Sequence, residues 1–277
     1  MTSSIQFGLR AAVVLALGVS AVTLPAAERR AAKPQFDPAT AVDLFDAMDT
    51  KDIEVKLIMK DDTEARVFIS NKTKKPLTVK LPDAFAAVPV LAQRAGGGGL
   101  NAGGGGANGG GQQSMGGGMG GGMMGGMGGG MGGGMGGMMN IPPEKIAQFK
   151  VATVCLEHGK KEPKPNIPYE IKKIEVVTSK PEVRELLTAL GKKHLNQRAA
   201  QAAAWHLANE MSWEQLANKQ IEHLDGSSEL YFHPQEIAAG MQIASGAAAQ
   251  AAEVEAKAPK KSPGEAVEAA KAVTISE

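Results

Sequence analysis

A tract of glycine and methionine between residues 96 and 139 limits what this chain can fold into more than any other feature of the sequence. Methionine recurs at every fourth position from Met115 to Met139, a spacing that would line one face of an α-helix. Glycine costs about 0.8 to 1 kcal/mol relative to alanine in a helix interior, so the glycines of this stretch would together cost on the order of 15 kcal/mol. Such a penalty is as large as the stability of a whole domain. The tract is therefore predicted to be a disordered coil.

The N-terminal 27 residues have the layout of a secretory signal peptide. Arg10 precedes an apolar run from Ala11 to Leu24, and small residues then lead into a charged segment. The run is short for a membrane span, which needs about twenty apolar residues. Export to the periplasm or the extracellular space is therefore predicted, with cleavage favoured over retention as an anchor. Residues 28–36 are polar and are predicted to be a disordered leader.

Charge and composition exclude several classes of protein. The chain has 30 basic and 29 acidic residues, and few aromatic side chains that could stack on bases, so a nucleic-acid partner is not expected. The single cysteine, Cys155, can form no internal disulfide. The five histidines fit no zinc-ligand spacing. No set of residues forms a nucleophile, a base and an oxyanion donor, so an enzyme is not predicted.

Strand patterns stand on both sides of the tract. Apolar residues alternate with polar ones over 53–60, 65–70 and 76–82, and strand-like segments return at 149–159 and 169–177. The economical interpretation is one immunoglobulin-like antiparallel β-sandwich, built from 37–95 and 140–178 and interrupted by 96–139 as a loop insertion. A short helix is predicted from Pro38 to Met48, with Asp37 as its N-cap.

From Lys180 onward the apolar spacing becomes helical. Helices are predicted at Pro181, near Gln197, after a capping box of Ser212 and Gln215, and at Pro234. In the last of these, Ile237, Met241 and Ala244 are expected to face inward. Residues 180–250 are predicted to form a small helical bundle. Residues 251–277 have almost no large apolar side chains and are predicted to be a disordered tail.

Two functional hypotheses attach to particular residues. Thioether sulfurs suit Cu(I), and a coil could gather several of them around one ion. This alternative, a periplasmic copper(I)-binding protein, would draw on Met115, Met119, Met123, Met127, Met131, Met135 and Met139. The favoured interpretation of the tract is a spacer or weakly adhesive segment, because it contains no histidine or acidic residue.

The sequence "AQAAAWH" around Gln201 resembles the Thr-Gln-x-x-x-Trp signature of thioester domains in bacterial surface adhesins. That resemblance implies a covalent thioester between Cys155 and Gln201. The chain departs from the signature at Ala200, which replaces the threonine.

Four segments carry a broader resemblance: "NKTKKPLTVKLPDAF", the glycine-rich insertion, "VCLEHGKKEPKPNIPYEI" and "QAAAWHLANEMSWEQLA". In this order they resemble an uncharacterised family of exported bacterial proteins, which implies export and this architecture but no activity. We therefore expect an exported, non-catalytic, envelope-associated structural or protein-interaction protein without a cofactor. Its expected partner is an envelope or extracellular protein, with no contact with nucleic acid and none with membrane beyond the signal peptide. Self-association stays open.

Overall fold

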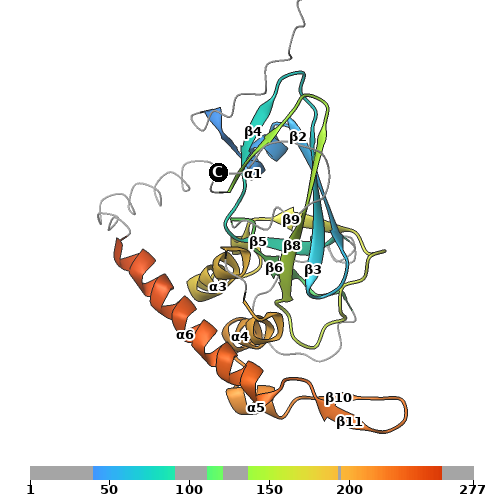
Figure 1. Ribbon diagram of the computed structural model, residues 1–277, viewed down its shortest axis with the longest axis vertical. Helices are drawn as coiled ribbons and strands as arrows, with labels where there is room; N and C mark the ends of the chain where they lie inside the picture. The colour runs from blue at the N-terminus through green and yellow to red at the C-terminus, as the bar shows by residue number, and fades with distance from the viewer. Residues whose placement is uncertain (1–39, 91–110, 121–136, 193–194, 258–277) are drawn as a thin grey trace, which may run out of the picture. The chain divides into compact units, whose positions relative to one another are not determined.

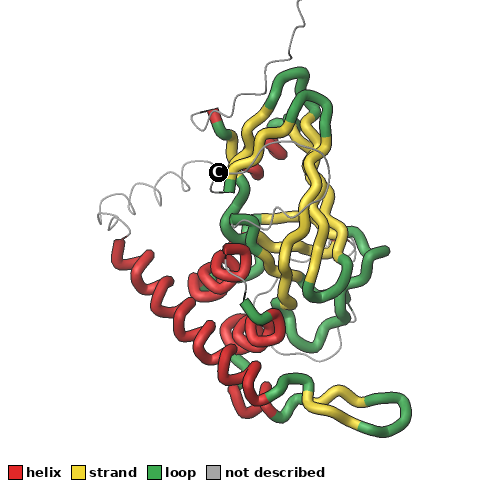
Figure 2. The backbone as a smooth tube through the Cα atoms, in the orientation of Figure 1, coloured by secondary structure: helices red, strands yellow, loops and turns green. Residues whose placement is uncertain are grey.

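The computed structural model describes residues 40–90, 111–120, 137–192 and 195–257, all within one compact unit, Phe36–Glu277. The described chain mixes strands and helices, as Figures 1 and 2 show, so the predicted α+β class is confirmed. The predicted signal peptide and leader, and residues 258–277 of the predicted tail, lie outside the described residues.

Most strands form a closed barrel in the order β2, β3, β8, β6, β5 and β9, with every neighbouring pair antiparallel. Their bounds are β2 Ile53–Met59, β3 Glu64–Asn71, β5 Phe85–Pro89, β6 Met115–Gly117, β8 Ile146–Cys155 and β9 Tyr169–Lys172. The prediction of an immunoglobulin-like sandwich is therefore wrong, because the sheet curls round and pairs with itself.

The barrel closes through a strand of the glycine and methionine tract. β6 pairs with β8 on one side and with β5 on the other. Without β6 these two neighbours would be open sheet edges. The prediction of a disordered insertion over 96–139 is therefore wrong for Met115–Gly117. Residues 96–110 and 121–136 of the tract lie outside the described part of the chain.

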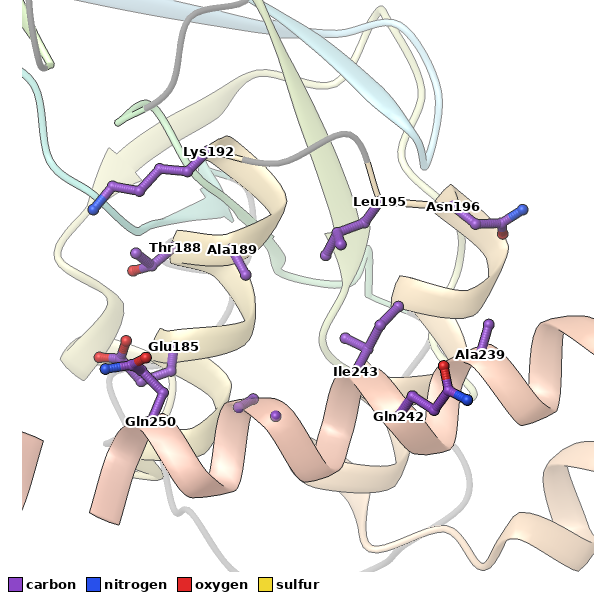
Figure 3. A pocket seen from close by; sticks show the side chains of 12 residues that line it. Glu185, Thr188, Ala189, Lys192, Leu195, Asn196, Ala239, Gln242, Ile243 and Gln250 are labelled. Atoms are coloured by element: carbon purple, nitrogen blue, oxygen red, sulfur yellow. The ribbon is translucent and has the colours of Figure 1, made fainter. Parts of the chain in front are cut away.

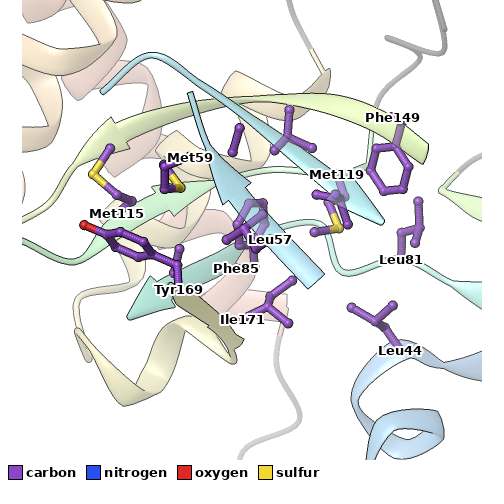
Figure 4. Close-up of a cluster of buried hydrophobic side chains, with 14 of the residues drawn as sticks. Leu44, Leu57, Met59, Leu81, Phe85, Met115, Met119, Phe149, Tyr169 and Ile171 are labelled. Carbon is purple, nitrogen blue, oxygen red and sulfur yellow. The ribbon is translucent and has the colours of Figure 1, made fainter. Parts of the chain in front are cut away.

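The barrel interior is an apolar core. Successive side chains of a strand point to opposite faces, so alternate residues of each strand line the inside. Figure 4 shows Phe85, Met115 and Ile171 among these side chains, and all three are buried. The outward residues between them, such as Ala86 and Val154, belong to a second core formed with the helices.

A smaller, three-stranded sheet shares the hydrophobic core of the barrel. It consists of β1 (Val42–Asp43), β4 (Leu77–Lys80) and β7 (Met138–Ile141), with β1 parallel to β4 and β4 antiparallel to β7. Helix α1 (Leu44–Asp49) follows β1 directly, and its N-cap Asp43 accepts from Phe45 N at 2.9 Å. The helix predicted from Pro38 with Asp37 as cap thus begins later, because Val42 pairs with Val79 as a strand.

The C-terminal part is helical, with one projecting hairpin. Its elements are the 3-10 turn η2 (Ile174–Val176), α3 (Pro181–Lys192), α4 (Gln197–Asn209), α5 (Trp213–Ala217), β10 (Gln220–Glu222), β11 (Ser228–Leu230) and α6 (Pro234–Lys257). The predicted capping box of Ser212 and Gln215 is confirmed at the start of α5. Helices α3 and α4 bury leucine and alanine side chains against the outward face of the barrel, and α6 packs on α3 and α4.

Helix α6 departs from its prediction in two ways. It continues to Lys257, although residues 251–257 are predicted to belong to the disordered tail. Alanine is the strongest helix former, and Ala247 and Ala251 are buried, which explains the extension. Ile237 and Ala244 are buried as predicted, but Met241 is 43% exposed. Among the described residues no helix is long and apolar enough to cross a membrane.

Candidate functional site

Three of the seven methionines proposed as copper ligands fill the hydrophobic core. Met115 and Met119 lie with the barrel's interior side chains in Figure 4, and Met139 on β7 pairs with Val79. All three are at least nine-tenths buried. These three methionines therefore belong to the packed core and not to a coil that gathers sulfurs around copper. For Met123, Met127, Met131 and Met135, which lie outside the described residues, copper binding stays a prediction.

The glycines next to Met115 allow the chain to approach its neighbours closely. A Cβ atom at Gly117 would lie 2.6 Å from the ring of Phe85, and one at Gly118 would lie 2.8 Å from Cα of Gly191 in α3. Real Cβ atoms do not come so close to other heavy atoms. These glycines are therefore required by packing, and the tract contacts α3 with its bare backbone.

Cys155 and Gln201 do lie together, through hydrogen bonds. The Gln201 side chain on α4 accepts from Cys155 N at 2.8 Å and donates to Cys155 O at 2.9 Å. Gln201 thus acts as a neighbouring strand would, and it ties α4 to the end of β8. Its amide has a structural role in this geometry, and the thioester stays a prediction. Burial raises the pKa of the Cys155 thiol, so the nucleophilic thiolate is disfavoured.

An aromatic cluster, which the sequence analysis did not identify, joins α4 to the chain on both sides of the β10–β11 hairpin. The Trp205 ring lies 5.4 Å from that of Tyr231 and 5.8 Å from that of Phe232. Two cations flank Tyr231: Lys219 Nζ is 5.2 Å and the Arg198 guanidinium 4.8 Å from its ring centroid. Because Lys219 precedes the hairpin and Tyr231 follows it, this cluster clamps the base of the hairpin.

Charges around this cluster act on its titratable groups. Burial, followed by the nearby Asp62 carboxylate, raises the pKa of Tyr231. Burial also raises the pKa of Asp62, with Arg198 opposing the shift. On the other side of Trp205, the His158 ring packs edge-on at 4.8 Å, and partial burial together with Lys219 lowers the pKa of His158. The cluster therefore favours the neutral forms of these three groups, as expected of a structural anchor.

The hairpin itself projects from the helices, as Figure 1 shows. Residues 222–230 are all exposed, and Leu224 near its tip is fully exposed. Its turn is nevertheless well formed: Gly226 has a φ of +81°, and Asp225 Oδ1 accepts from Ser227 N at 2.9 Å. The sequence pair Asp-Gly is a strong hairpin signal. That signal does not indicate whether the two strands are covered or exposed.

No protein-family model matches the chain, and the searches against curated proteins and against solved structures found no match either.

Proposed function

We propose that this chain is an exported, non-catalytic protein-interaction protein, and that the β10–β11 hairpin, residues 220–230, is its contact element. The observation that carries the proposal is a regular hairpin whose tip residue, Leu224, is fully exposed although the base is clamped. An isolated two-stranded hairpin is marginally stable in water. A hairpin that is held in shape while its residues 222–230 stay exposed suits a partner molecule.

Preorganisation supports this proposal. The hairpin base is held by the backbone bond from Tyr231 N to Lys219 O, 2.8 Å, and by the cations on the Tyr231 ring. The turn is held by the Asp225 side chain, which accepts from both Ser227 N and Ser227 Oγ. An element that is ordered before binding loses less conformational entropy on binding, so its contacts contribute more affinity.

The side chains of the hairpin indicate the chemistry of the partner. Between Gln220 and Leu230 the chain has the carboxylates Glu222, Asp225 and Glu229, and no lysine or arginine. Leu224 and Leu230 add exposed apolar surface. The fitting partner is a protein with an apolar pocket rimmed by lysine or arginine. Anionic lipid and nucleic acid would both be repelled by these carboxylates.

The test uses the protein without its signal peptide, immobilised and exposed to the exported proteins of the cells that make it. We expect Leu224→Ser to lose the captured partner, because Leu224 is the apolar side chain at the tip. The double variant Glu222→Gln/Glu229→Gln is expected to weaken capture at low salt, and its capture should depend less on salt than that of the parent.

The matched control is Ile146→Ser, because Ile146 on β8 is also a large apolar residue, 65% exposed, but lies on a different element. It should capture the partner as the parent does. Equal capture by the parent and by Leu224→Ser would contradict the assignment of the hairpin. Equal loss in both variants would point to nonspecific apolar adhesion.

A further inference from the structure

A groove with a volume of about 640 Å³ runs between α3 and α6. Figure 3 shows its lining: side chains of α3, of the connection that leads to α4, and of the middle of α6. The lining residues are Glu185, Thr188, Ala189, Lys192, Leu195, Asn196, Ala239, Gln242, Ile243, Gly246, Ala247 and Gln250. The hairpin and its aromatic base take no part in this surface.

The floor of the groove is made of small residues. Few side-chain atoms cover it, because its residues are Ala189, Ala239, Gly246 and Ala247. A Cβ atom added at Gly246 would meet nothing within 4 Å. Leu195 and Ile243 add apolar surface, whereas the polar side chains stand at the rim. Such a groove fits a helix that presents alanine and valine, because small side chains let two backbones approach closely and leave no void.

The chain itself continues past this groove with a segment of that kind. The lining on α6 ends at Gln250 and the helix ends at Lys257, about 10 Å further along its axis. Twenty residues follow, 258–277. The first seven, "APKKSPG", contain two prolines and a glycine, and seven extended residues span up to about 24 Å, which is enough to reverse direction and return to the groove.

The next residues, "EAVEAAKAVT", separate into two faces at helical spacing. Ala266, Ala269, Ala270 and Val273 fall on one face, and Glu265, Glu268 and Lys271 fall on the other. The apolar face is made of small side chains, which matches the small-residue floor of the groove. A helix this short is marginal alone in water and needs packing to be stable.

We propose that the C-terminal segment 265–274 docks as a helix in the α3–α6 groove of its own chain. The short linker gives the segment an effective concentration of about 1 mM at the groove. A dissociation constant of about 100 µM measured between separate molecules would then leave the groove about ten times more often occupied than empty.

The test compares the full chain with a chain that ends at Lys257. A fluorescein-labelled peptide of residues 258–277 is titrated with each, and its polarisation is followed. We expect saturable binding to the shortened chain and at least ten-fold weaker binding to the full chain, whose groove is already occupied. No saturable binding to the shortened chain overturns the proposal.

Two variants of the shortened chain test the location. Gly246→Leu fills the groove and is expected to abolish peptide binding, whereas Ala248→Leu, on the opposite and exposed face of α6, is expected to leave it unchanged. Equal binding to both variants places the peptide elsewhere and overturns the proposal. Concentration-dependent dimers of the full chain in sedimentation, absent from the shortened chain, would mean docking on a second copy and would overturn the intramolecular form. Each result is independent of capture by the hairpin.

Discussion

The strands β6 and β11 each have three residues but differ in burial. Every residue of β6, Met-Gly-Gly, is buried and the strand closes the barrel, whereas every residue of β11, Ser-Glu-Leu, is exposed. Neither sequence has a strong intrinsic preference for a strand. β6 is ordered by what surrounds it, namely β5, β8 and α3, and β11 is ordered by a local turn and an aromatic base.

This difference in burial indicates a different role for each strand. In β6 the glycines are set by contacts with distant residues, so the strand has a structural role and little tolerance to change. In the hairpin every residue from Glu222 to Leu230 is exposed, so we expect the fold to tolerate changes there; under the proposed function such changes would alter binding instead. The following predictions test this division, beginning with the largest effect.

Gly118→Val should be the most damaging single change. A Cβ atom there would lie 2.8 Å from Cα of Gly191 and 2.9 Å from the backbone oxygen of Asp83, and backbone atoms cannot swing aside. We expect a loss of about 3 kcal/mol in the free energy of unfolding, measured by urea denaturation. Gly246→Ala is the control: nothing lies within 4 Å of its added Cβ, and the helix should gain up to about 1 kcal/mol. Equal stability of both variants would remove the packing role of the tract.

Gln201→Leu tests the side chain that supports the strand next to β6. Cys155 pairs with Met115 on one side and with the Gln201 amide through its N–H and C=O. Leucine would leave two buried backbone groups without partners, and we expect a loss of about 2 kcal/mol in the free energy of unfolding, measured by urea denaturation. The exposed Gln235→Leu should change stability by less than about 0.5 kcal/mol. An intact mass lower by one ammonia in the parent chain would instead support the thioester.

The contrast between β6 and β11 also explains how far sequence reasoning reached. Alternating residues predicted β2, β3 and β8, and the Ser212 capping box predicted the start of α5, because these signals are local. Closure of the barrel was missed because it depends on Leu187, Phe85 and Gly191, far away along the chain, which make glycine favourable in β6. Propensity alone assigned those glycines to coil.

The candidate site was predicted in part for the same reason. The pair Asp225-Gly226 is typical of a hairpin turn. Whether a hairpin is covered depends on all other elements, so its exposure cannot be read from its own residues. Cys155 and Gln201 were brought together by a resemblance, and the structure joins them through the Cys155 backbone. The aromatic base, Trp205 with Tyr231 and Phe232, links residues too far apart for any spacing rule.

Asp62→Asn tests the charge between the two regions. Burial raises the pKa of Asp62 above its ordinary value of 3.8, so the folded protein holds this proton more tightly than the unfolded chain. The associated stability is present below pH 3.8 and is lost as pH rises through the folded pKa. Asparagine should therefore raise the melting temperature at pH 7 and give no such gain at pH 3. The exposed Asp49→Asn removes the same charge and should give a smaller gain. A lower melting temperature for Asp62→Asn at pH 7 would contradict this assignment.

Gly226→Ala should have the smallest global effect and separates the hairpin from the fold. Gly226 has a φ of +81°, where alanine is strained by about 1 to 2 kcal/mol. Because residues 222–230 are all exposed, that strain should open the hairpin and leave the global free energy of unfolding within about 0.5 kcal/mol. Amide exchange at Ser227 and His223, measured by NMR, should speed up by about five-fold or more, while exchange in β6 and β8 stays unchanged. Gly226→Asn is the control, because asparagine tolerates a positive φ. A fall in global stability with Gly226→Ala would mean that the hairpin supports the core, and the division between a buried structural strand and an exposed contact strand would fail.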